Sequence, residues 1–360
     1  MKKKLAAALL TALTAASLSA CGSQDADSAK GTQDNADSQA NEEQDDSEGG
    51  ASYKVGIVQF VDDASLNQIE KSLEKGLDEK GKELGVTFEY DGYVFNGQAD
   101  ATVLNQIGAD LVADDVDAII AIATPAAQVM QAAVEDTQIP VIFSAVTDPV
   151  TAGLVEDLNE PGANITGTSD ALDTNAVFDL MFAANPDIRS VGLLYSKSED
   201  ASAKAIEEAK AYCKEKGVEV TEKTGTTNDE VSLGADALAA AGVDAVFTPT
   251  DNTVMKAELA IYEKFIDSKI PHYTGADSFA LNGAFLGYGV NYEELGAATA
   301  DMAAEVLAKG ADPAKTPVQM MDNGIATVNI ETAEKIGLDY SVFSDLCETV
   351  KEIKTAEEFE

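Results

Sequence analysis

The 360-residue chain contains one arginine, one histidine, three cysteines and no tryptophan. A single histidine, His272, and the absence of a Cys-x-x-Cys pair argue against a zinc site. There is no Gly-x-Ser-x-Gly nucleophile motif and no glycine-rich phosphate loop. The sequence therefore predicts a protein that is not an enzyme and needs neither a metal nor a cofactor.

Positive charge is scarce, with 24 Lys and Arg against 64 Asp and Glu and a formal net charge of −40. A field of that sign repels nucleic acid and anionic lipid headgroups. We therefore exclude nucleic acid as a partner. Any membrane association has to come from a covalent lipid instead of a basic patch.

The first twenty residues are typical of a secretory signal peptide. Three lysines precede the apolar stretch Leu5–Leu18, which is too short to span a membrane. Leu18-Ser19-Ala20-Cys21 resembles the lipobox of bacterial lipoproteins, in which the cysteine becomes the lipidated N-terminus. The alternative is an ordinary signal peptide with a chance cysteine. We predict a signal peptide at 1–20, a lipid on Cys21 and a location on the outer face of the cell membrane.

Residues 22–50 carry no large apolar side chain. Such a segment cannot offset its ordering entropy by burial, so we predict a disordered tether over 21–50. From Ala51 onward the composition is globular, and about 300 residues suffice for two domains. For Cys213 and Cys347 we favour two free thiols over a disulfide.

The globular part contains the same pattern twice. Val55-Gly56-Ile57-Val58 returns as Val191-Gly192-Leu193-Leu194, and Ile139-Pro140 returns as Ile270-Pro271. Since the period exceeds a hundred residues, each copy has the length of a domain. Two similar lobes that face each other form a cleft, which is a favoured place for a small ligand.

Within each copy, short apolar runs alternate with helical patterns, which is typical of parallel α/β layers. The predicted strands are 53–60, 87–93, 118–123, 141–144, 164–167, 190–195, 219–223, 245–248, 272–274, 285–290 (a strand or a hinge) and 325–329. The predicted helices are 66–84, 99–114, 125–135, 173–185, 198–216, 229–240, 252–268 and 292–309.

Ligands bind to parallel sheets beyond the carboxyl ends of the strands, so the candidate residues follow the strands. Thr124 begins a helix whose N–H groups could receive a carboxylate, or its hydroxyl could cap that helix. Asp148 could accept an ammonium group or cap the next turn. The other candidates for ligand binding are Gln59, Phe60, Thr147, Tyr195, Asp251, Asn252, Thr253, Asp277 and Tyr288.

Carboxylates dominate these loops, while the only arginine, Arg189, precedes its strand at the opposite end. Phosphates and dicarboxylates generally require arginine or lysine clamps. An acid-rich cleft with helix N-termini suits a zwitterion, with its amine on an aspartate and its carboxylate on backbone N–H groups. The aromatic candidates Phe60, Tyr195, Phe279 and Tyr288 either stack on a flat ligand or belong to the core.

Six motifs carry a resemblance to a known family. They are Lys54–Phe60, Ala121–Gln128, Thr147–Val155, Asn164–Gly167, Pro249–Thr253 and Gly287–Gly296. In them the sequence resembles the substrate-binding lipoproteins of ABC transporters. The nearest group is the type I fold family that includes the tryptophan- and tyrosine-binding proteins of Gram-positive bacteria.

The resemblance implies two Rossmann-like α/β lobes joined by three crossing strands. The implied divisions are 53–167 plus 290–319 for the first lobe, 168–289 plus 320–345 for the second, and an acidic tail at 346–360. The resemblance also implies that the protein binds an amino acid, most of all an aromatic one, and delivers it to a membrane permease. We expect the protein to be a monomer. The alternatives are a nucleoside or other amine as ligand, or a tethered ligand sensor.

Overall fold

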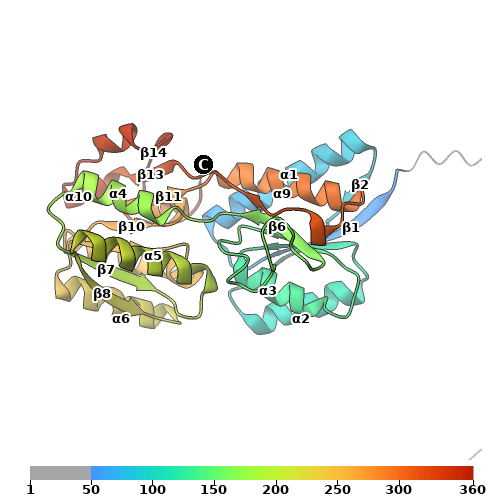
Figure 1. Ribbon diagram of the computed structural model, residues 1–360, viewed down its shortest axis with the longest axis horizontal. Helices are drawn as coiled ribbons and strands as arrows, with labels where there is room; N and C mark the ends of the chain where they lie inside the picture. The colour runs from blue at the N-terminus through green and yellow to red at the C-terminus, as the bar shows by residue number, and fades with distance from the viewer. Residues whose placement is uncertain (1–49, 360) are drawn as a thin grey trace, which may run out of the picture. The chain divides into compact units, whose positions relative to one another are not determined.

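The computed structural model describes residues 50–359, so the predictions for the signal peptide, Cys21 and nearly all of the tether lie outside the described residues. Two sheets of seven strands organise the described part (Figure 1). We call each sheet, together with the helices packed on it, a lobe.

The first lobe is built on a sheet whose paired strands are all parallel. Its strand order is β12 (Gln319–Met320), β6 (Ile165–Ser169), β5 (Val141–Ser144), β4 (Ala118–Ile122), β1 (Ser52–Gln59) and β2 (Thr87–Glu89), and β3 (Val94–Asn96) also pairs with β1. Its helices are α1 (Ala64–Leu84), α2 (Ala101–Ala113), α3 (Thr124–Ala133), α9 (Tyr292–Leu307) and the 3-10 turn η1 (Pro313–Lys315).

The second lobe repeats this plan with one antiparallel pair, β11 with β13. Its strand order is β14 (Thr349–Ile353), β13 (Ile325–Asn329), β11 (Leu286–Gly289), β10 (His272–Thr274), β9 (Ala245–Thr248), β7 (Ser190–Tyr195) and β8 (Glu219–Thr224). Its helices are α4 (Thr174–Ala184), α5 (Asp200–Lys216), α6 (Asn228–Ala241), α7 (Asn252–Asp267), α8 (Asp277–Leu281), α10 (Ile330–Ile336) and η2 (Ser341–Asp345).

The chain crosses between the sheets three times: after β6, after β11 and after β12. As the resemblance implies, α9 returns to the first lobe, where it packs along α1 (Figure 1). The two helices approach closely through small residues, since a Cβ on Gly76 would stand 2.6 Å from that of Ala300. A Cβ on Gly296 would stand 2.4 Å from the carbonyl oxygen of Ile69. The predicted α/β fold class with two lobes is confirmed.

Two predictions about elements need correction. The strand expected over 87–93 ends at Glu89, because a turn with Gly92 at φ 85° follows, and a separate strand, β3, begins at Val94. The segment 346–360, expected to be a tail, contains β14, which pairs in parallel with β13. The exact residue limits of the lobes stay predictions.

Both cysteines within the described residues are free thiols, as favoured from the sequence. His272 is buried between Glu258 and Thr248, which lie 3.1 and 2.8 Å from its ring nitrogens, so it has a structural role. None of the helices over residues 50–359 combines the length and the apolar character needed to cross a bilayer.

Candidate functional site

A narrow cavity of about 10 Å³, with room for about one water molecule, lies between the carboxyl ends of the two sheets. Its walls come from the residues that follow β4, β5 and β6 in the first lobe and β9 in the second, and from the first turns of α1, α5, α7 and α9. The lining residues are Ser65, Leu66, Ala123, Thr124, Ala145, Thr147, Asp170, Ala201, Thr250, Asn252, Met255 and Tyr292.

The N-terminus of α3 opens into this cavity without a side-chain cap. Ala123 occupies the capping position with φ 78° and ψ 152°, a conformation otherwise reserved for glycine. No side chain accepts from the first N–H groups of the helix. Ala145, at the matching position after β5, also has a positive φ of 55°. Strained backbone of this kind persists where a ligand has to be positioned.

Thr124, the first residue of α3, carries the most informative polar atom of the site. Its side chain is 2 % exposed, and its hydroxyl is buried with no hydrogen-bond partner. It is therefore not the cap of its own helix. An uncapped helix N-terminus and a free hydroxyl together form a receptor for a carboxylate, because both supply donors and the helix dipole favours negative charge.

One carboxyl group, that of Asp170, lines the same cavity. Asp170 follows β6 and is 5 % exposed, and its Oδ1 accepts a hydrogen bond of 2.9 Å from the hydroxyl of Thr147. Burial raises the pKa of Asp170 to about 6, although the Thr147 hydroxyl works in the opposite direction. A cationic ligand group would offset this desolvation, so Asp170 is suited to bind an ammonium group.

The second lobe contributes Thr250, Asn252 and Met255 to the cavity. The hydroxyl of Thr250 donates to the carbonyl oxygen of Gly275 at 3.1 Å, so this side chain is already satisfied. Asn252 donates from Nδ2 to Glu199 at 3.1 Å. The apolar part of the lining comes from Met255 together with Leu66 and Tyr292.

Three of the residues predicted from the sequence to bind ligand line the cavity: Thr124, Thr147 and Asn252. Two predicted acids serve as caps instead. Both oxygens of Asp148 accept from Thr151, at 3.0 Å from its backbone N–H and 2.8 Å from its hydroxyl. Asp251 is fully buried and caps α7. Its carboxylate accepts from the N–H of Ser196, the hydroxyl of Ser202 and the N–H of Val254, at 2.7, 2.7 and 3.0 Å.

The other predicted residues lie outside the cavity lining. Gln59 donates to the carbonyl of Val61 and the side chain of Asn67, Tyr195 donates to Glu222 at 2.7 Å, and Thr253 donates to Glu199 at 3.0 Å. Phe60 and Tyr288 pack into the hydrophobic cores. Their predicted contacts with a ligand are not supported by these positions.

The third predicted acid, Asp277, joins the two lobes. Its Oδ1 accepts from the hydroxyl of Ser65 at 2.5 Å and its Oδ2 from Nε2 of Gln68 at 3.2 Å, both on α1. The same Ser65 hydroxyl accepts from the N–H of Ser278 at 3.1 Å. Across the cleft, Gln128 of α3 donates to Asp200 of α5 at 2.7 Å. Asn67 of α1 also donates to Glu358, which follows β14, at 2.8 Å. The lobes are therefore in direct contact at three places.

Sequence reasoning missed Asp170, Ser65 and Tyr292. Asp170 could have been found, because it comes three residues after the predicted end of a strand, where the other candidates were sought. Ser65 and Tyr292 are the second and first residues of α1 and α9. Neither residue type signals a ligand, and only the return of α9 to the first lobe brings Tyr292 to the cavity.

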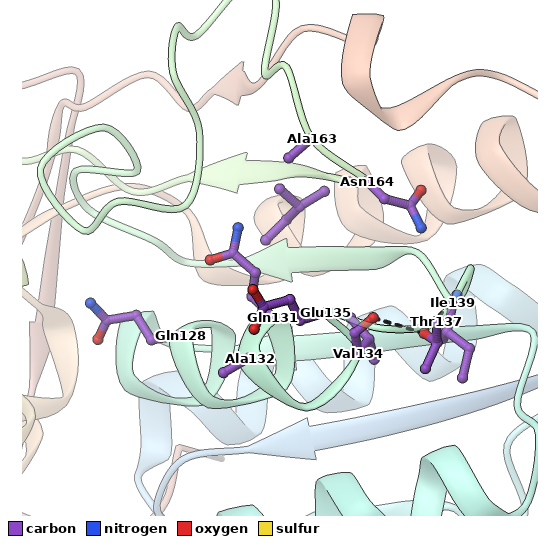
Figure 2. A pocket seen from close by; sticks show the side chains of 10 residues that line it. Gln128, Gln131, Ala132, Val134, Glu135, Thr137, Ile139, Ala163 and Asn164 are labelled. Carbon is purple, nitrogen blue, oxygen red and sulfur yellow. Dashed lines mark hydrogen bonds between the residues drawn. The ribbon is translucent and has the colours of Figure 1, made fainter.

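A larger and more open groove runs along α3 (Figure 2). Gln128 and Gln131 of α3 and Glu135 of the following turn lie on one side of it. Ala163 and Asn164, which precede β6, lie across from them. It therefore extends toward the amino ends of β5 and β6, away from the edge where ligands bind to parallel sheets. Within residues 50–359 no group of three or more potential ligand side chains could hold a metal ion.

Two mostly parallel α/β lobes, three crossings and a cavity between the lobes define a solute-binding protein with the type I periplasmic-binding-protein fold. The family described as ABC transporter substrate binding protein matches residues 54–343. The chain belongs to this family, whose members bind solutes and are not enzymes.

The chain is 33 % identical over 303 residues to a tyrosine-binding protein of Clostridioides difficile (strain R20291), a match covering 84 % of this chain and 85 % of that one. A Streptococcus pneumonia ABC domain in complex with L-Trp is 33 % identical with a TM-score of 0.76, covering 83 % of this chain and 100 % of that one. The ligand-free, open structure of a substrate-binding protein with adhesive properties from Clostridium difficile is 31 % identical with a TM-score of 0.64, covering 84 % and 100 %. At similar identity and coverage, the chain has a higher TM-score with the relative in complex with L-Trp than with the ligand-free, open one. This agrees with the direct contacts between the two lobes of this chain.

Proposed function

We propose that this chain is the lipid-anchored, extracytoplasmic receptor of an ABC importer and binds an aromatic amino acid in the cavity between its lobes. The ligand carboxylate lies at the N-terminus of α3 and on the hydroxyl of Thr124. The ammonium group lies on Asp170. The ring packs among Leu66, Met255 and Tyr292.

One observation carries the proposal: an unpartnered donor, Thr124, and a buried carboxyl group, Asp170, line the same enclosed cavity. A zwitterion supplies both partners at once, the carboxylate for the donors and the ammonium for the acid. No lysine or arginine lines the cavity, which disfavours dianions and phosphates. The cavity in this closed arrangement has room for little more than one water molecule (about 10 Å³), so the lobes have to move apart to admit an amino acid.

The relatives support an aromatic side chain. One is named as a tyrosine-binding protein and another was crystallised with L-Trp. The apolar residues of the cavity come from both lobes, so a flat ring held between them would contact both lobes at once. Closure is driven by contacts that exist only when both lobes reach the ligand.

Calorimetric titration of refolded, ligand-free protein tests the proposal. Tyrosine and tryptophan should bind with micromolar or lower Kd, about −8 kcal/mol or better, whereas alanine and adenosine should bind far more weakly. Glu135→Gln, in the open groove along α3, is the matched control and should leave binding unchanged. Absence of binding by every amino acid, or tight binding of adenosine instead, would refute the assignment.

Anchoring and delivery need separate tests. Cys21→Ser should release the protein from the membrane fraction into the medium if the lipobox directs lipidation. Delivery to a permease predicts that deletion of the gene abolishes uptake of the labelled ligand by cells. Uptake that persists while a transcriptional response to the ligand is lost would indicate a sensor. We also expect a monomer by light scattering.

A further inference from the structure

Beside the cavity, a buried carboxylate holds the one amide that lines it. Glu199 precedes α5 and is 6 % exposed. Its Oε2 accepts from Nδ2 of Asn252 at 3.1 Å, and its Oε1 accepts from the hydroxyl of Thr253 at 3.0 Å. Nothing in the proposed binding of the carboxylate and ammonium groups uses either Glu199 or Asn252.

This contact determines which end of the amide is available to a ligand. Burial raises the pKa of Glu199 to about 7, so above that pH its carboxylate is ionised and only accepts hydrogen bonds. It then binds the NH₂ end of an amide and not the oxygen. Both oxygens of Glu199 accept here, one from Asn252 and one from Thr253. The carbonyl oxygen, Oδ1, is therefore the atom of Asn252 that remains for the cavity, and the amide acts there as an acceptor.

The position of Asn252 assigns this acceptor to the side chain of the ligand. The donors at Thr124 and α3 take the carboxylate, and Asp170 takes the ammonium group, all on the first-lobe side. Asn252 belongs to the second lobe, on the first turn of α7. Met255 lies three residues further on the same face of the helix, which places an apolar surface next to the acceptor.

We propose that Glu199 and Asn252 form a specificity device that selects aromatic side chains carrying a hydrogen-bond donor, a phenol O–H or an indole N–H, over a plain phenyl ring. The inference rests on the proposed function, because it needs an aromatic amino acid in the cavity. Asn252 contacts the ligand through Oδ1. Glu199 is a positioning residue that keeps the amide from turning.

The size of the discrimination follows from the cost of an unpaired buried acceptor. Leaving such a group without a partner costs about 1–3 kcal/mol. The wild-type protein should therefore bind tyrosine about 5- to 150-fold more tightly than phenylalanine, at about 1.4 kcal/mol per tenfold.

The test measures the ratio of the Kd for phenylalanine to the Kd for tyrosine by calorimetric titration in four proteins, at a pH above the raised pKa of Glu199, which is about 7. In Asn252→Leu the acceptor is absent, so the ratio should fall to about 1. In Glu199→Gln the new amide can donate to Oδ1 of Asn252. The NH₂ group of Asn252 then turns toward the cavity, and the ratio should again fall to about 1. Ser202→Ala removes a buried hydrogen bond to Asp251 nearby without touching Asn252, and it should lower the melting temperature while keeping the wild-type ratio.

The outcomes separate this inference from the proposed function. Equal affinity of the wild-type protein for tyrosine and phenylalanine would overturn the inference while leaving the proposed function standing. Variants that weaken the binding of tyrosine and phenylalanine equally would also overturn the inference, because Asn252 would then contact the ammonium or carboxylate group that both ligands share. If the wild-type protein binds no aromatic amino acid, both proposals fail together. A Kd ratio of 5 or more in the wild-type protein that falls to about 1 in Asn252→Leu and Glu199→Gln supports the specificity device.

Discussion

Replacing Asp170 with asparagine should change ligand affinity and the stability of the free protein in opposite directions. The substitution keeps the shape of the side chain and the contact with Thr147 but removes the charge that we assign to the ligand ammonium group. Affinity for tyrosine should therefore fall. The ligand-free protein should become more stable, because it no longer has to bury a charge.

The structure gives the approximate size of both effects. Burial raises the pKa of Asp170 from the ordinary 3.8 to about 6. Each pH unit corresponds to about 1.4 kcal/mol, so keeping this carboxylate ionised at pH 7.5 costs the free protein about 3 kcal/mol. Removing one partner of a buried charged pair costs binding about 2–5 kcal/mol, which is a loss of affinity of at least about 30-fold.

Thermal melts at pH 7.5, with and without tyrosine, measure both quantities in one experiment. For Asp170→Asn the ligand-free melting temperature should rise by several degrees, and the increase caused by tyrosine should nearly vanish. Asp148→Asn is the matched control, since Asp148 only caps a turn outside the cavity, and its ligand-induced increase should match that of the wild type. If Asp148→Asn abolished the increase and Asp170→Asn did not, our assignment of the ammonium site would be wrong.

Four further experiments test other parts of the structure. Thr124→Val should weaken tyrosine binding about 10-fold or more by calorimetry, because it removes a donor to a charged carboxylate, while unfolding in urea stays unchanged. Affinity for tyrosine should be constant above about pH 6 and fall below it as Asp170 becomes protonated; an affinity that increases toward pH 5 would contradict this. Burial also raises the pKa of Asp63 to about 7. The folded protein therefore binds more protons than the unfolded chain, and its stability falls as the pH rises. The urea midpoint of the ligand-free protein should decrease between pH 5 and pH 7.5. Asp251→Ala should cost about 3 kcal/mol of unfolding free energy, since it leaves the N–H of Ser196 and the hydroxyl of Ser202 unpaired; a loss below 1 kcal/mol would show that neither bond matters.

Most of the fold could be predicted from the sequence because its strands are buried on both faces. Ala118–Ile122 reads as a continuous apolar run, and all five of its residues are buried. β14 was missed for the opposite reason. It is an edge strand of lysine, glutamate and threonine with Val350 and Ile353 only partly buried, so no apolar run distinguishes it from an acidic tail.

The candidate site was less predictable, because a loop aspartate has the same sequence signature whether it binds a ligand or caps a helix. Asp251 precedes α7 and Asp63 precedes α1, and both accept from backbone N–H groups of the first turn. Thr124 was ambiguous in the same way until the backbone showed Ala123 in the capping position. Asp170 differs in having no helix of its own to cap, a fact that depends on how the chain crosses to the second lobe.

The packing of α9 on α1 has a consequence during synthesis. The two helices are separated by more than 200 residues of chain, so α1 keeps one apolar face uncovered until the ribosome has made almost the whole protein. Contacts that join distant parts of a chain form slowly. The contact between α1 and α9, which completes the first lobe, can therefore form only after strands β7 to β11 of the second lobe have been made.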